Sequence, residues 1–590
     1  MEYRKLTLDE IAQLGRQNCR AQNWTLIEVP VDFIPQYIHQ THFSGQIRLG
    51  KFQKTFMLPG GVPKHSGISN ATLHNCEIGD NVLIENVHGA IANYRIGANT
   101  HIQNVGSLVA DGQSSFGNGV KVTVLNEAGG MEIKIQDQLS APVAYMLAIF
   151  RHRPSFLEKM EAMIDHYVQQ QMSVYGEIGR DVQILHTTSI KNVKIGNSAR
   201  IEGAARLENG SINSNEHDPV FIGHQVIAED FIISSGACVD SGAILSRCFV
   251  GQTCHLGRSF SAMDSLFFSN CHAENGEAVS VFAGPFTATH HKSTLLIAGM
   301  FSFLNAGSGS NQSNHRYKSG PVHYGIFERG VKLASDSYVL YPARIGAFSL
   351  VMGRHYQSPD TSDFPFSYLI EEKEETLLIP GVNLKTVGLA RDAEKFPKRD
   401  CRKDPHLLDP IRFEVLTPYT VQKMLRGIEI SKEFQNQNGT PEFYVYSGCK
   451  IPASAVQKGI DLYSLAIRKY LGEITGNQTD KSFLNQTESS SWMDLSGLIL
   501  PQSQVEKFIE AIETGQISTI AKMHEMLAGF HQNYACYEWN FIRNIKGLSD
   551  HWEQIIADGK SAAAILAQEI QKDREKENQL IKKSYGNTSF

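Results

Sequence analysis

The feature that most constrains the fold of this chain is a repeat of short phrases in which an aliphatic residue precedes glycine. Ile78-Gly79 recurs eighteen residues later as Ile96-Gly97, and similar phrases begin at positions 178, 195, 222, 250 and 345. Between some phrases an apolar residue returns at every sixth position: Val226, Ile232, Cys238, Ile244, Val250 and Leu256. A period of six fits neither an α-helix nor a simple alternating strand. It predicts very short strands that end at corners, where Gly, Asn or Asp tolerates the backbone.

Three units of six would close one coil of eighteen residues, and stacked coils would bury a continuous aliphatic column. This spacing resembles that of the hexapeptide-repeat proteins. The resemblance implies a mainly β solenoid, a left-handed parallel β-helix, over residues 66–390. Gly-rich turns in an ordinary β-sandwich are the alternative, but they would not keep spacings of six and eighteen in phase. The series from Val226 to Leu256 is therefore expected to point inward.

Three other regions follow from composition and apolar periodicity. Residues 1–65 should form an N-terminal cap region, opening with a capping box between Thr7 and Glu10. Apolar residues at helical spacing predict a helical insertion at about 137–173. From 391 to 450, 20 of 60 residues are charged, and further apolar stripes follow, so 391–590 is expected to be a mainly helical C-terminal region.

The charge balance argues against a nucleic-acid partner. The chain has 590 residues with 55 Lys+Arg, 61 Asp+Glu and a net charge of -6, so it carries no cationic excess for a phosphate backbone. Its longest apolar stretches are well under the roughly 20 residues of a membrane span. Nine cysteines without a C-x-x-C pair, and an N-terminus without a secretory signal, predict a cytoplasmic protein. A small-molecule substrate is the expected partner.

The segment from Gly284 to Gly325 is the candidate site. It holds four histidines, three amide-bearing asparagines and three cations, but no carboxylate. Neutral amides and imidazoles suit hydroxyl groups, and cations suit a phosphate. Adjacent His290 and His291 are the candidate general bases. The candidate substrate-binding residues are Lys292, Asn305, Asn311, Asn314, His315, Arg316, Lys318 and His323.

Several of these residues also have structural interpretations. Asn305, Asn311 and Asn314 could instead stack as a ladder of amides. His315 and His323 could be structural or could orient the substrate. Farther along the chain, Asp360 or Asp363 could orient a catalytic histidine, although an ordered turn is the simpler interpretation of that segment.

Longer phrases, such as Gly284-Pro-Phe-Thr-Ala-Thr-His-His-Lys and Gly309-Ser-Asn-Gln-Ser-Asn-His, resemble a bacterial family known mainly as a domain of unknown function. The match extends over nearly the whole chain. The wider hexapeptide-repeat superfamily includes similar trimeric acyltransferases that use acyl-CoA and a histidine base. The resemblance therefore implies a homo-oligomer, by analogy a trimer, with acyl-CoA as co-substrate and no tightly bound cofactor.

Three functional hypotheses follow. The first is an acyltransferase that acts on a sugar, sugar phosphate or nucleotide-sugar with His290 or His291 as base, and it assigns no residue to a metal. The second is a zinc metalloenzyme similar to the β-helical carbonic anhydrases, with His290 or His291, His315 and His323 as candidate ligands. The third is a non-catalytic scaffold protein that binds a sugar or nucleotide.

Overall fold

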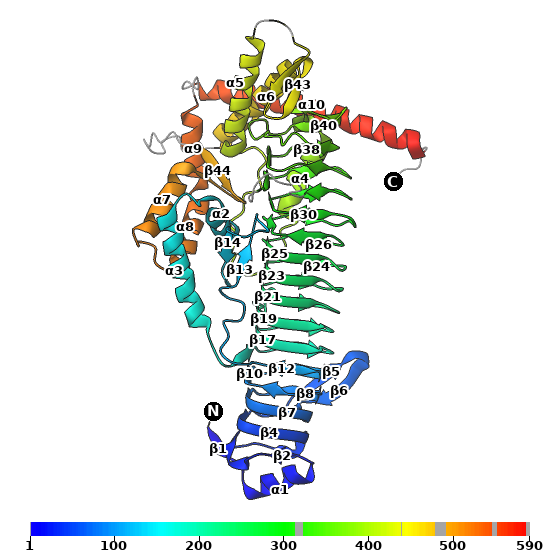
Figure 1. The fold of residues 1–590 in the computed structure, drawn as a ribbon, viewed down its shortest axis with the longest axis vertical. Helices are drawn as coiled ribbons and strands as arrows, with labels where there is room; N and C mark the ends of the chain where they lie inside the picture. The colour runs from blue at the N-terminus through cyan, green and yellow to red at the C-terminus, as the bar shows by residue number, and fades with distance from the viewer. Residues whose placement is uncertain are drawn as a thin grey trace.

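The computed structural model describes residues 2–312, 323–437, 439, 441–477, 491–545 and 551–585. Most of its strands join one 39-stranded sheet, accompanied in the described residues by ten α-helices. Figure 1 shows the strands stacked along the long axis, with the N-terminal region at one end and helices along one side and at the other end. We call the parallel strands from β7 (Gly67–Ile78) to β40 (Tyr368–Glu372) the strand column.

Three ladders of parallel strands make up the later part of the strand column. The first ladder contains β24 (His255–Gly257), β26 (His272–Glu274), β29 (Ala288–Thr289), β32 (Asn305–Ala306) and β35 (Lys332–Leu333). The second contains β21 (Ile227–Ile233), β23 (Ile244–Val250), β25 (Ser261–Phe267), β28 (Phe282–Ala283), β31 (Gly299–Phe301), β34 (Gly325–Phe327) and β37 (Ala343–Ile345). The third contains β27 (Glu277–Val279), β30 (Leu295–Ile297), β33 (Asn311–Gln312) and β36 (Tyr338–Val339).

The predicted left-handed β-helix of hexapeptide repeats is wrong. The described residues contain a closed barrel of six parallel strands, with many strands outside it and ten α-helices, and they indicate no such solenoid. The strand register also departs from the predicted repeat. Ile78 pairs with Ile96, eighteen residues on, but Leu245 pairs with Ala262, seventeen residues on. A shift of one residue exchanges the inner and outer faces of a strand, so a strict period of six fails.

The series from Val226 to Leu256 shows this error directly. Val226, Val250 and Leu256 are buried in the main core, but Ile244 is 47% exposed and Cys238 is only half-buried. Ile232 is buried on the outer side of the strands, in a second apolar cluster. The neighbouring Leu245 takes the inward position and is 1% exposed. The predicted series therefore mixes inward and outward residues.

The N-terminal region joins the same sheet. The capping box is confirmed: Thr7 precedes α1 (Leu8–Arg16), its side chain accepts from Glu10 N, and the Glu10 carboxylate accepts from Thr7 N. β4 (Ile38–Leu49) then pairs in parallel with β7 and begins the stack. Past the insertion the stack continues without a break, because Ile102 pairs directly with Ile184.

A helical layer covers the second ladder. α2 (Ala141–Ile149) and α3 (Pro154–Gln171) come from the insertion, whereas α7 (Gln502–Glu513) and α8 (Ile520–Gln532) come from the C-terminal region. Figure 1 shows α3, α7 and α8 together on one side of the strands. They pack against an in-register row of outward apolar side chains, namely Ile232, Phe249, Leu266, Phe282 and Met300. This row explains why the second ladder carries large apolar residues on both of its faces.

The C-terminal region closes the far end of the strand column. α5 (Pro418–Gln435), α6 (Ala453–Asn477), α10 (Trp552–Tyr585) and the hairpin β42 (Phe443–Tyr446)–β43 (Cys449–Pro452) lie at this end. α4 (Val387–Lys398), α9 (Tyr534–Arg543) and the hairpin β44 (Trp492–Leu495)–β45 (Leu498–Pro501) lie along the side of the strand column. α6 and α10 cross where Gly472 faces Gly559, and a Cβ on Gly472 would lie 2.6 Å from the Gly559 Cα. Among the described helices, none is long and apolar enough to cross a membrane.

Candidate metal centre

Two strands of the first ladder place a pair of histidines side by side. His255 begins β24 and His272 begins β26, and the two residues are register partners. Their neighbours Cys254, Leu256, Cys271 and Ala273 are buried, so alternation along each strand turns both imidazoles outward. The rings stack with their centroids 4.7 Å apart and their planes inclined by 23°.

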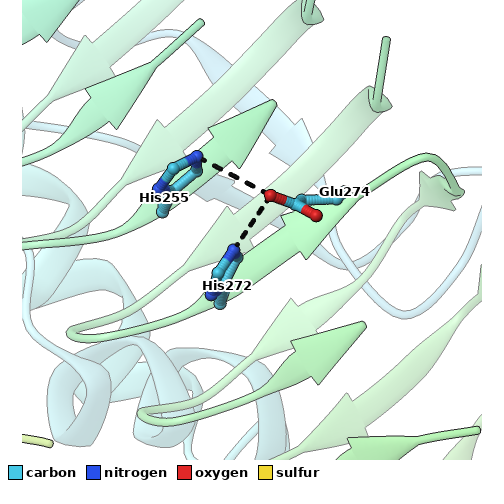
Figure 2. A group of neighbouring side chains, drawn as sticks. All are labelled: His255, His272 and Glu274. Carbon is cyan, nitrogen blue, oxygen red and sulfur yellow. Dashed lines mark hydrogen bonds and ion pairs between the residues drawn. The ribbon is translucent and has the colours of Figure 1, made fainter. Parts of the chain in front are cut away.

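A carboxylate completes this cluster. Glu274 lies two residues after His272 and therefore on the same face of the strand. Figure 2 shows both histidine rings turned toward its carboxylate, with Oε1 3.3 Å from the Nε2 of His272 and 3.9 Å from the Nε2 of His255. One ligand atom from each of the three residues lies within 4.8 Å of the others. The second carboxylate oxygen, Oε2, is 3.3 Å from a guanidinium nitrogen of Arg258.

His290 borders the cluster from the next strand of the ladder. It follows β29, and its ring stands perpendicular to that of His272, with the centroids 4.4 Å apart. Asn275 Nδ2 donates to the His290 backbone carbonyl at 3.1 Å and fixes that turn. Burial lowers the pKa of His290, and the nearby His272 lowers it further. The same two causes lower the pKa of His255. Both effects favour the neutral imidazole, which is the form that accepts a proton or a metal.

The donor set fits a divalent metal of the zinc type. Two imidazole nitrogens and one carboxylate oxygen are ordinary zinc ligands, and three protein ligands leave a coordination position open. In a tetrahedral site with bonds near 2.0 Å, ligand atoms are about 3.3 Å apart. The distances from the Glu274 oxygen to the two nitrogens, 3.3 and 3.9 Å, need only a small side-chain adjustment to meet this geometry.

The predicted site residues do not assemble as one constellation in the described residues. His291 and Lys292 follow His290 and are exposed, and Asn305 is exposed on β32. Asn311 belongs to β33 of the third ladder, and half-buried His323 precedes β34 of the second. The described residues therefore place His290 and His323 on different ladders. The remaining predicted residues lie outside the described residues: Asn314, His315, Arg316 and Lys318.

The other structural alternatives can also be located. Asparagine ladders exist, but in the N-terminal part of the strand column: Asn70 donates to Asn86, and Asn86 donates to Asn104, each at 3.1 Å. Asp363 accepts from the Tyr446 hydroxyl at 2.9 Å rather than from a histidine.

The site residues predicted from the sequence do not include His255, His272 and Glu274. A signal for them does exist in the sequence. The dipeptide Cys-His occurs at 254–255 and again at 271–272, seventeen residues apart, each time followed by a small or aliphatic residue. This spacing is one residue shorter than the eighteen residues between Ile78 and Ile96. The carboxylate was missed because it lies ten residues before the segment that begins at Gly284.

Comparison with known proteins places this site in a family context. The family model described as "Domain of unknown function (DUF4954)" matches residues 3–435. The chain belongs to the DUF4954 family. The DUF4954 match includes the metal-ligand candidates and the whole strand column, whereas a second model, "Domain of unknown function (DUF6819)", matches residues 478–586. These findings confirm the resemblance to a family of unknown function and do not show the hexapeptide-repeat superfamily.

A curated relative extends the likeness beyond the DUF4954 segment. An "Uncharacterized protein" of Treponema pallidum (strain Nichols) is 24% identical over 578 residues. The alignment covers 89% of this chain and 79% of the relative, so it includes both the strand column and most of the C-terminal region.

Proposed function

We propose that this protein is a metal-dependent hydrolase in which His255, His272 and Glu274 hold one divalent cation. The convergence of one ligand atom each from His255, His272 and Glu274 within 4.8 Å carries this proposal. A zinc ion bound by three protein ligands supplies a water of lowered pKa as a nucleophile at neutral pH. An electrophilic carbonyl or phosphoryl group is the matching substrate chemistry.

The neighbouring residues have separate roles in this proposal. Arg258 holds Glu274 Oε2, which leaves Oε1 directed at the two imidazoles. Such positioning of a ligand by an outer partner orients the donor atom. His290 lies against His272 and can accept a proton from an attacking water. His255 and His272 retain side-chain exposures of 44% and 40%, so a substrate in solvent can reach the centre.

Acyl transfer to a sugar, sugar phosphate or nucleotide-sugar stays a prediction. One observation favours His290 over His291 as its base, since His290 is half-buried against His272 and His291 is exposed. The two hypotheses differ in their dependence on metal. Acyl-CoA turnover that persists after chelation would favour acyl transfer, and zinc-dependent ester cleavage would favour the hydrolase.

The experiment compares metal-free and zinc-reconstituted protein on two chromogenic substrates, p-nitrophenyl acetate and p-nitrophenyl phosphate. We expect zinc to restore cleavage of at least one substrate in the wild type. Glu274→Gln should lower this activity by roughly 10²-fold or more, since it removes a charged ligand. His224→Ala, which removes an exposed histidine at another turn of the strand column, is the matched control and should retain activity. Equal rates with and without zinc would contradict the proposal.

A further inference from the structure

A cleft separate from the metal centre lies beside the second ladder. Its volume is 640 Å³, and its walls come from α2, α5, β37 and the β44–β45 hairpin, through residues that include Tyr145, Tyr419, Arg344 and Asp494. These four residues also line a smaller inner cavity of 30 Å³. The metal-ligand candidates belong to the first ladder, so the two sites occupy different faces of the strand column.

The row of outward side chains on the second ladder changes from apolar to charged at this cleft. It continues past Met300 to Ile326, and the next register partner is Arg344. Arg344 keeps 44% of its side chain exposed. Its closest carboxylate is that of Glu328, with Nε 3.6 Å from Oε1, which is too long for a hydrogen bond. The Arg344 guanidinium therefore lies at the wall of the cleft, and its N–H donors are available to a ligand.

A second guanidinium lies at the inner cavity. The Arg329 side chain is 0% exposed, and its charge lies over the Phe303 ring, 4.7 Å from the centroid. One of its terminal nitrogens donates to the Arg412 carbonyl. Its Nε and other terminal nitrogen have no hydrogen-bond partner among the described residues, and Asp494 Oδ2 is 3.6 Å from Nε. Fully buried donors without partners are costly, so a polar group that met them would be strongly favoured.

The cleft and the inner cavity are lined by equal numbers of basic and acidic side chains, namely Arg329, Arg344, Lys423 and Arg426, and Glu328, Asp363, Asp494 and Glu506. Lys423 Nζ lies 3.1 Å from Glu328 Oε1, so this carboxylate is shared between Lys423 and Arg344. Asp494 faces Arg329, but its Oδ1 accepts from Gly497 N at 2.7 Å. An anion is therefore favoured here by the unused N–H donors of Arg344 and Arg329 and not by an excess of positive charge.

The local structure holds these groups in place. The Gln422 side chain on α5 donates to the Trp492 carbonyl at 2.7 Å and accepts from Trp492 N at 2.8 Å. This pair of bonds fixes β44 against α5 and directs Asp494 toward Arg329. Burial raises the pKa of Tyr145 to about 12 and also raises that of Tyr419, so both phenols stay protonated and can donate.

We propose that this cleft binds a small molecule through an oxyanion group, a phosphate or a carboxylate, held by Arg344 and Arg329. The volume of 640 Å³ is that of a site for a small metabolite. Guanidinium groups bind both oxyanions through paired N–H donors. The aromatic walls formed by Tyr145, Phe150, Tyr419 and Trp492 suit a planar or apolar remainder of the ligand.

The test uses isothermal titration of the full chain with phenyl phosphate, benzoate and neutral phenol. We expect one of the two anions to bind at a single site and phenol to bind at least about tenfold more weakly. The anion that binds more tightly identifies the preferred oxyanion. Arg344→Gln should weaken anion binding about tenfold or more without lowering the thermal transition, because this side chain is partly exposed.

Arg426→Gln is the matched control. Arg426 lines the outer part of the same cleft, but its guanidinium pairs with Glu429 at 3.1 Å. This variant should bind the anion within about twofold of the wild type. Equal anion affinity in the wild type and Arg344→Gln would overturn the proposal, as would phenol binding as tightly as phenyl phosphate and benzoate. Absence of binding by both anions at millimolar concentration would also overturn it.

Discussion

His255 and His272 are register partners on adjacent strands, and both direct Nε2 toward the same oxygen of Glu274. Side chains alternate between the two faces of each strand, and the flanking residues are buried in the core, so both histidines must point outward. Three ligand atoms are therefore organised by backbone register rather than by a flexible loop. A site of this kind keeps its geometry when a single ligand is replaced, which makes conservative variants informative.

The strand register predicts that an aspartate is tolerated at position 244 and strongly destabilising at position 245. Leu245→Asp places a carboxylate in the main core at a position that is 1% exposed, and it should cost about 4 kcal/mol or prevent folding. Ile244→Asp changes a side chain that is 47% exposed and should cost less than about 1 kcal/mol. Soluble yield and chemical denaturation measure both. Similar losses in the two variants would contradict this register.

Asp409 is predicted to stabilise the contact between the insertion and the strand column. Its buried carboxylate accepts from Ala141 N at the start of α2, and from Ser269 N and Ser269 Oγ. Asp409→Ala leaves these donors unpaired and should lower the free energy of unfolding by about 3 kcal/mol. Glu414→Gln, which alters an exposed carboxylate nearby, should cost less than about 1 kcal/mol. Faster hydrogen exchange in α2 of the Asp409 variant alone would support this role, and unchanged exchange would refute it.

Glu538 should make stability depend on pH. Burial raises its pKa from 4.5 to about 7, although Tyr470 and Tyr534 donate to its carboxylate. The folded state therefore holds this proton more tightly than the unfolded state. Its contribution to stability is present below the unfolded pKa and is lost as pH rises through about 7, by about 3 kcal/mol in total.

Glu538→Gln provides the comparison, because an amide does not titrate in this range. The stability of the wild type relative to the variant should fall between pH 5 and pH 8, as measured by denaturant titration at each pH. If the difference in stability between the wild type and Glu538→Gln stays constant from pH 5 to pH 8, Glu538 does not titrate in this range and the prediction is wrong.

Local features of the fold could be predicted from the sequence. The capping box at Thr7 depends on residues three positions apart, and the helical tail inside α10 depends on the propensity of successive residues. The one-residue shortening of the repeat is present in the Ile-Gly phrases at 178 and 195, which pair seventeen residues apart, but the pairing of strands across an insertion is decided by the neighbouring strands. Ile102 and Ile184 illustrate this, since they pair across 82 positions.

The site was predictable only in part. His290 was identified, but the residues beside it come from earlier strands of the ladder, and their proximity depends on the seventeen-residue register. The cleft at Arg344 and Arg329 was not predictable, because its wall combines α2, the strand column and the C-terminal hairpin. Contacts between such distant segments leave no periodic signal in the chain.

The most direct test of the metal centre is the zinc content of the purified full chain after equilibration with zinc and exhaustive dialysis. The wild type and the His224→Ala control should each retain about one zinc ion per chain, and His272→Ala and Glu274→Gln should lose most of it. Glu274→Gln should remain folded, since the Arg258 that pairs with Glu274 is 67% exposed. Zinc retained equally by all four proteins, or by none of them, would contradict a centre built from His255, His272 and Glu274.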